Sequence, residues 1–133
     1  MELTSSLQNF ILKKTTALRR RAAEKEIVSM LLENWTSLPP VDAVREIAAD
    51  DADYTVTKMF LPRGRGPAPH HHPHKQVVVI LEGSGVMLLG DEQIEFSAGS
   101  VISVPPDLPH TMLYTAEESR WLEFFTPGRE DWR

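Results

Sequence analysis

The N-terminal third of the chain carries apolar residues at helical spacing. Residues 5–35 contain no glycine or proline and are rich in Leu, Ala, Lys, Arg and Glu, which favours helix. The apolar stripe moves to a different face near residues 22–26, because each helical residue advances the face by about 100°. We therefore expect two short helices, or one that changes its packing surface, ending at Leu38-Pro39-Pro40. The two stripes comprise Leu7, Ile11, Leu18 and Ala22, then Ile27, Met30, Leu31 and Trp35.

From Val41 onward the pattern changes to short, β-rich runs separated by turn residues. About eight such runs in about 90 residues predict an all-β fold, a small antiparallel barrel or jelly roll. The chain thus divides into a helical N-terminal arm, residues 1–40, and a barrel, residues 41–133. The expected strands are 42–49, 53–62, 76–81, 85–89, 93–97, 101–104, 110–115 and 119–126.

Length and composition agree with one barrel domain preceded by an arm. The chain has 133 residues, of which 41% are hydrophobic, enough for one buried core. The arm holds six basic and four acidic residues, whereas the barrel is acidic and brings the net charge to −5. Cysteine is absent, so any metal must be held by histidine, carboxylate, amide or water.

Charge and hydropathy weigh against nucleic-acid and membrane partners. A compact acidic chain lacks the clustered positive charge of general nucleic-acid binders, and the basic cluster at Lys13-Lys14 and 19–21 accompanies no evident recognition helix. The longest apolar run, residues 77–81, is five residues long, whereas a membrane span needs about 20. The first 30 residues also lack the apolar segment of a signal peptide. We expect a cytoplasmic protein.

All five histidines lie at two places, residues 70–74 and His110. On a strand, alternate residues share a face, so His70, His72 and Gln76 would project together. A rigid proline-rich turn, residues 105–109, could bring His110 to them from another strand. Such a set suits a first-row divalent metal. His74 shares the parity but follows Pro73, and it stays an alternative ligand.

These residues fall at the spacings of the two motifs of the cupin family. The first motif is resembled by Gly64, His70, His72, Gln76 and Gly83. The second is resembled by Gly99, Pro105, Asp107 and His110. Gln76 stands where the family usually has Glu, and Asp107 replaces a turn glycine. The resemblance implies a double-stranded β-helix barrel with one metal ion held inside by His70, His72, Gln76 and His110.

The glutamine bears on the chemistry of that ion. Three imidazoles and one amide leave the charge of a divalent metal uncompensated, which strengthens it as a Lewis acid toward carbonyl or anionic oxygens. This favours polarisation, enolisation, ring opening or cyclisation over oxygen chemistry. The ion could be zinc, nickel, manganese or iron, because both affinity and cellular supply select it.

The C-terminal segment, residues 122–132, resembles the closing segment of a cupin subgroup that includes the pectin-degradation enzyme that linearises unsaturated uronates. The resemblance implies that Glu123 is the catalytic acid, Phe125 a pocket aromatic and Arg129 the partner of a substrate carboxylate. Glu123 and Phe125 share strand parity, so both could face the barrel interior. Alternatively, Glu123 lies on a solvated rim and Arg129 pairs with Glu130 or Asp131. Met59 and Met112 are further candidates for the pocket wall.

Together these patterns predict a metal-dependent, non-redox enzyme acting on a small oxygen-rich anion, such as an unsaturated uronate. Polyketide cyclisation is a variant of the same class. A metal-dependent dioxygenase and a non-catalytic ligand-binding or sensing cupin are the alternatives. We also expect the amphipathic arm to support a homodimer, because its stripe suits contact with two surfaces.

Overall fold

The structure, a computed structural model, describes residues 34–133. The helices expected over residues 5–35 lie almost wholly outside the described residues, and so does most of the arm on which the homodimer prediction depends. The last residues of the arm do lie within them. There a short 3-10 helix, η1 (Trp35–Ser37), stacks Trp35 on Tyr114 with the ring centroids 6.5 Å apart.

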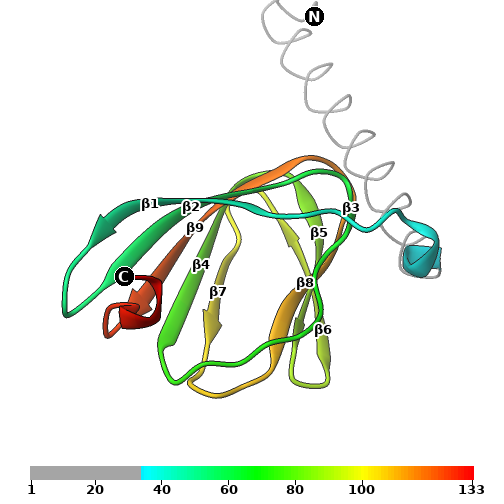
Figure 1. Cartoon of the computed structure of the whole chain (residues 1–133). Coiled ribbons are helices and arrows are strands. Elements are labelled where there is room, and N and C mark those ends of the chain that lie inside the picture. The colour runs from blue at the N-terminus through cyan, green and yellow to red at the C-terminus, as the bar shows by residue number, and fades with distance from the viewer. Residues whose placement is uncertain (1–33) are drawn as a thin grey trace, which may run out of the picture. The chain divides into compact units, whose positions relative to one another are not determined.

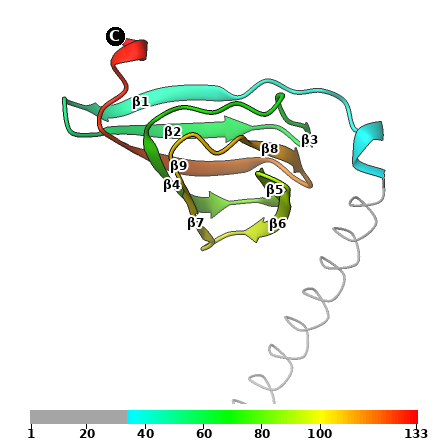
Figure 2. The same cartoon turned by 90° about the horizontal axis from the view of Figure 1, so that it is seen from below.

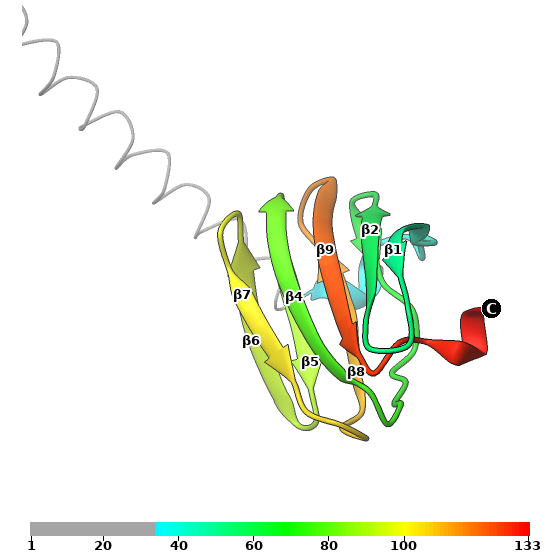
Figure 3. The ribbon, with the colours of Figure 1, turned by 90° about the vertical axis from the view of Figure 1, so that its left-hand side faces the viewer.

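Two antiparallel sheets face each other in this part of the chain (Figure 1 and Figure 2). The five-stranded sheet has the order β1-β2-β9-β4-β7, and Figure 3 shows these strands side by side. The four-stranded sheet has the order β3-β8-β5-β6. The strands are β1 (Val44–Asp50), β2 (Thr55–Leu61), β3 (Gly64–Arg65), β4 (Lys75–Glu82), β5 (Ser84–Leu89), β6 (Glu92–Ser97), β7 (Val101–Val104), β8 (His110–Thr115) and β9 (Ser119–Thr126); η2 (Glu130–Trp132) follows β9.

Eight of these strands were expected from the short β-rich runs between turn residues, and the all-β prediction is confirmed. β2 shows the alternation clearly, because its odd-numbered residues are buried and the residues between them are more exposed. The two-residue strand β3 was missed. Gly64 and Arg65 have little strand propensity, and they are extended because they pair with Thr115 and Tyr114 of β8.

The hydrophobic core lies between the two sheets. Val78 and Ile80 of β4 are buried, as the strand parity predicted, and they pack in one cluster with Met87, Phe96 and Trp121. β4 is rich in β-branched residues and pairs with β7 on one side and β9 on the other, which makes it a central strand. Among the described residues, no helix is both long and apolar enough to span a bilayer.

Candidate metal centre

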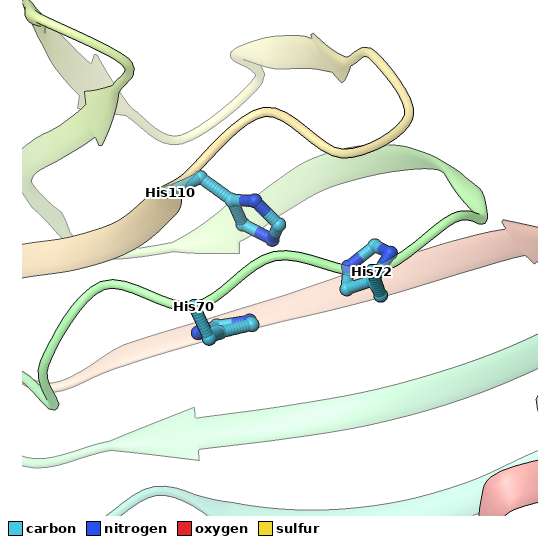
Figure 4. Close-up of side chains that lie close together, drawn as sticks. All are labelled: His70, His72 and His110. Carbon is cyan, nitrogen blue, oxygen red and sulfur yellow. The ribbon is translucent and has the colours of Figure 1, made fainter.

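Three imidazole rings lie close together (Figure 4). Ring nitrogens of His70, His72 and His110 all lie within 4.8 Å of one another. His110 begins β8, whereas His70 and His72 come from the segment between β3 and β4, residues 66–74, which we call the histidine loop. Backbone hydrogen bonds join the two segments: the His70 N–H donates to the His110 carbonyl (3.0 Å), and the His110 N–H donates back (2.9 Å).

The prediction that His70, His72 and Gln76 project together from one strand is wrong, because the two histidines do not lie on a strand. β4 begins at Lys75, so Gln76 is on a strand but His70 and His72 are not. Prolines 67, 69 and 73 provide no N–H groups, and the histidine loop cannot continue a ladder. The three side chains are brought together by the bridge to His110 instead.

The turn that precedes His110 also holds His72. Asp107 adopts the left-handed conformation (φ 61°), and its N–H donates to the His72 carbonyl at 2.8 Å. Aspartate tolerates this region because its short polar side chain can hydrogen-bond locally. Asp107 therefore adopts the left-handed backbone conformation for which the cupin motif usually has a glycine.

In His72 and His110, the hydrogen bond made by one ring nitrogen shows that the other nitrogen is the candidate metal ligand. Nδ1 of His110 lies 2.7 Å from the Leu108 carbonyl, and Nδ1 of His72 lies 3.1 Å from the His74 carbonyl. A carbonyl only accepts, so both rings carry their proton on Nδ1 and present a lone pair at Nε2. His110 Nε2 is buried and has no hydrogen-bond partner. Histidine ligands in metal sites typically donate their other N–H to a carbonyl in this way.

Gln76 supplies an oxygen to the same point. Its Oε1 lies 2.9 Å from Nε2 of His72. With the His72 proton on Nδ1, the Nε2 lone pair and the amide oxygen lie close enough for one cation to accept both. Two ligands at right angles on one ion, each about 2.1 Å from it, are about 3 Å apart. The residues present therefore fit one divalent metal ion.

Desolvation keeps these imidazoles neutral. Although His70 is the exposed member of the three, desolvation is the largest cause that lowers its pKa to about 4, and a second proton would also be repelled by Arg129 and by protonated His110 or His72. Burial also lowers the pKa values of His72 and His110. Their lone pairs are consequently free at neutral pH, as metal ligation requires.

His74, the alternative ligand, is not in the group of close donors. Its ring centroid is 5.5 Å from that of His72, and its Nδ1 is buried without a partner. What His74 contributes directly is its backbone carbonyl, which accepts from His72.

A cavity of about 160 Å³ lies beside the imidazoles. His70, Gln76 and His110 line one side of it. All five residues predicted for catalysis or the pocket also line it: Met59, Met112, Glu123, Phe125 and Arg129.

Glu123 has the environment of a proton carrier. Burial raises the pKa of its carboxyl group. The Trp121 indole N–H donates to Oε1 at 2.9 Å, and the Thr57 hydroxyl donates to Oε2 at 3.4 Å, and both bonds partly offset that rise. Glu123 thus lies in the cavity wall. The alternative that it lies on a solvated rim of the barrel does not hold.

Arg129 has a partner within the chain. Its Nε and Nη2 donate to the two carboxylate oxygens of Asp131, at 2.9 and 2.7 Å. Pairing with Asp131 is one of the alternatives considered for Arg129 from the sequence. The arginine is nevertheless buried, and its guanidinium carbon lies 4.8 Å from the centre of the Phe125 ring. Asp131 neutralises a charge that also faces the cavity.

Arg45 and Trp132 are among the lining residues that the sequence did not indicate. Arg45 of β1 lies with its guanidinium carbon 3.9 Å from the centre of the Trp132 ring, and both residues line the cavity. Every residue of β1 is exposed, so no apolar alternation indicated which face of the strand is inward. Trp132 lies in the C-terminal segment, residues 122–132, but its sequence context indicated no role for it.

The comparisons with known proteins agree with this geometry. The Cupin_2 sequence model, described as a cupin domain, matches residues 57–125. The uncharacterized protein MJ1618 of Methanocaldococcus jannaschii is 33% identical over 57 residues, which cover 42% of this chain and 46% of that protein. The chain thus spans less than half the length of this relative.

Among solved structures, KdgF from Halomonas sp. has a TM-score of 0.64 and 25% identity, covering 68% of this chain and 84% of that one. This likeness supports the subgroup resemblance seen at the C-terminus. An RmlC-like cupin from Shewanella frigidimarina NCIMB 400 has a TM-score of 0.63 and 20% identity, covering 74% and 91%, and supports the fold alone. With the motif spacing, the paired sheets and a family match over more than half of its length, the chain belongs to the cupin family.

Proposed function

We propose that this cupin is a metal-dependent, non-redox enzyme of the isomerase, lyase or cyclase type. Its substrate would be a small oxygen-rich anion such as an unsaturated uronate. One observation carries the proposal: Glu123, an acid with a raised pKa, lines the same cavity as the imidazoles of His70 and His110 and the Gln76 amide. Acids with raised pKa values are suited to exchange protons near neutral pH.

The residues that would hold the ion are His70, His72, Gln76 and His110. A divalent metal bound there supplies Lewis acidity toward a substrate oxygen, undiminished by any anionic ligand among the four. We propose zinc, nickel, manganese or iron as the ion, in line with nitrogen-rich donors.

Glu123 would carry the proton. Oε1 accepts the shorter hydrogen bond, from the Trp121 indole, so a proton on the carboxyl group resides on Oε2. From there it can be donated to a substrate atom in the cavity, and the resulting carboxylate is stabilised by Trp121 and Thr57. The same carboxylate can then remove a proton, which makes Glu123 suitable for both halves of an isomerisation.

The substrate class is inferred from the remaining cavity wall. Met59, Met112 and Phe125 offer apolar surface to the carbon skeleton, while Arg45 and Arg129 also line the cavity. We propose that Arg129 helps to hold a substrate carboxylate with the N–H groups that Asp131 leaves free. The resemblance of residues 122–132 to the pectin-degradation cupins supports a uronate.

The test uses the full-length untagged protein, with His72→Ala and His71→Ala prepared alongside. We expect about one equivalent of metal and loss of the conjugated double-bond absorbance of an unsaturated uronate, both abolished in His72→Ala. His71 is exposed and outside the close donors, so His71→Ala should behave as the wild type. Unchanged metal content in His72→Ala would contradict the ligand set. Metal-dependent oxygen consumption without uronate conversion would favour a dioxygenase, and uronate binding without turnover a binding module.

We also propose that the N-terminal arm supports a homodimer in the cytoplasm. The amphipathic stripes of residues 5–35 motivate this. A variant without residues 1–36 is expected to be monomeric in light scattering where the full chain is dimeric. Retention of the full-length oligomeric state would rule out this role.

A further inference from the structure

Arg45 brings to the cavity a positive charge that forms no ion pair with a carboxylate of residues 34–133. Its strand, β1, is the edge strand of the five-stranded sheet, and Arg45 lies opposite Met59 of β2, another lining residue. Within residues 34–133, the arginines with acid partners are Arg120, Arg129 and Arg133, and Arg45 is not among them.

Trp132 holds this guanidinium at the cavity. The ring centre of Trp132 lies 3.9 Å from Cζ of Arg45 and 3.8 Å from Cζ of Arg129. A guanidinium held by an aromatic face keeps the N–H groups at its edge available, because the attraction is to the ring and uses no specific donor. The two arginines differ in that the side edge of Arg129 is bound to Asp131.

The C-terminal segment creates this arrangement after β9 has ended. Figure 3 shows the chain leaving β9 beside β1 and β2, where η2 follows. The Arg129 N–H donates to Thr55 Oγ1 at 2.8 Å, and Arg133 pairs with Asp50 at 2.9 Å. These bonds fasten the segment to both strands and so bring Trp132 to Arg45.

We propose that Arg45 is a carboxylate-binding residue of the cavity and supplies the net positive charge that selects anionic substrates. The inference rests on the proposed function and deepens it, because it assigns the substrate's carboxylate to a residue of the edge strand. The ligand class is a carboxylate on a small polar skeleton, such as a sugar acid. A carboxylate can take both edge N–H groups of Arg45 without displacing any acid of the protein. The charge of Arg45 also lowers the pKa of Glu123, so it acts within electrostatic reach of the proton carrier.

The experiment measures binding and turnover separately. Zinc-loaded full-length protein is titrated calorimetrically with galacturonate and with galactose, its uncharged counterpart. The variants are Arg45→Met, Arg45→Lys and the control Arg120→Met. Arg120 also lies over an aromatic ring, that of Phe60 at 4.5 Å, but it does not line the cavity.

We expect Arg45→Met to bind galacturonate at least tenfold more weakly, since charge-assisted bonds are lost. Galactose binding should be unchanged, Arg45→Lys should be intermediate, and Arg120→Met should match the wild type. In turnover of an unsaturated uronate, Arg45→Met should raise KM much more than it lowers kcat.

The two proposals can fail separately. If the wild type converts the uronate and Arg45→Met leaves both KM and galacturonate affinity unchanged, the Arg45 assignment is wrong and the proposed function stands. If no uronate is converted but galacturonate binding is lost in Arg45→Met, the Arg45 site stands and the proposed reaction is wrong. A wild-type protein that binds no galacturonate would overturn the Arg45 site.

Discussion

The two sides of the cavity are built in different ways. The histidine loop is held by backbone hydrogen bonds to β8 and to the turn before it, and its donors are neutral. The second wall, which we call the C-terminal wall, comprises β9, which pairs with β2 and β4, and residues 127–133, whose side chains form ion pairs and ring contacts. The histidine donors are thus placed mainly by backbone hydrogen bonds, whereas the charged and aromatic groups that follow β9 also depend on one another. Substitutions should therefore have local effects on the first side and coupled effects on the second.

The largest effect should come from removing the proton carrier. Glu123→Gln is expected to lower kcat about 10²–10⁴-fold, the usual contribution of general acid–base catalysis. Metal content should be unchanged, because Glu123 is not among the close donors. Glu46→Gln is the control, since Glu46 is an exposed carboxylate that does not line the cavity. Full activity in Glu123→Gln would show that Glu123 transfers no proton in the reaction.

Metal loading should stabilise the protein through the histidine side alone. Zinc at about 100 times its Kd would add about 2.7 kcal/mol to the free energy of unfolding. In calorimetry of chelator-treated protein, adding zinc should raise Tm. The same addition should leave the Tm of His110→Ala unchanged. Glu123→Gln should keep the rise, and an equal loss in both variants would contradict the division between the two sides.

Coupling within the C-terminal wall should be visible in the pH dependence. Trp121 and Thr57 lower the pKa of Glu123, so Trp121→Phe raises it and moves the corresponding limb of the kcat/KM profile to higher pH. Thr57→Val should move it in the same direction but less, because its contact is longer at 3.4 Å. A shift to lower pH in either variant would contradict the assignment of that limb to Glu123.

Asp131→Asn should change the affinity for anions by a smaller factor. Without Asp131 the charge of Arg129 is no longer neutralised, and galacturonate should bind a few-fold more tightly, as exposed charges contribute modestly. Arg45 and Arg129 both contact Trp132, so the gain in affinity from Asp131→Asn should differ between the wild type and Arg45→Met. Additive effects of the two substitutions would indicate independent sites.

The smallest effect concerns acid stability. Arg133 and Thr55 lower the pKa of Asp50 to about 2, so this carboxylate stabilises the fold above its unfolded pKa and loses that contribution as pH falls toward 2. Arg133→Gln should therefore move the acid unfolding midpoint to slightly higher pH, measured by circular dichroism. Arg120→Gln, which disrupts a longer exposed pair at 3.6 Å, should leave it unchanged.

Strand positions could be predicted because β alternation is a local property. The bounds expected for residues 101–104, 110–115 and 119–126 coincide with β7, β8 and β9. β3 could not be predicted, since Gly64 and Arg65 become a strand only through their pairing with β8. The same limit applies to Arg45, because nothing in an exposed edge strand indicates which face meets a distant tryptophan.

The sequence by itself determined the fold class, the family motifs and the residue types that can hold a metal, because spacing and composition are properties of the chain. It also indicated Glu123, whose strand parity with Phe125 is local. The tertiary structure decided how the donors converge. His70 and His72 reach His110 through a bridge between segments about forty residues apart, not through one strand face. It also decided the charge balance of the cavity, because Asp131 neutralises Arg129 and Trp132 holds Arg45 only once the C-terminal segment has folded against β1 and β2.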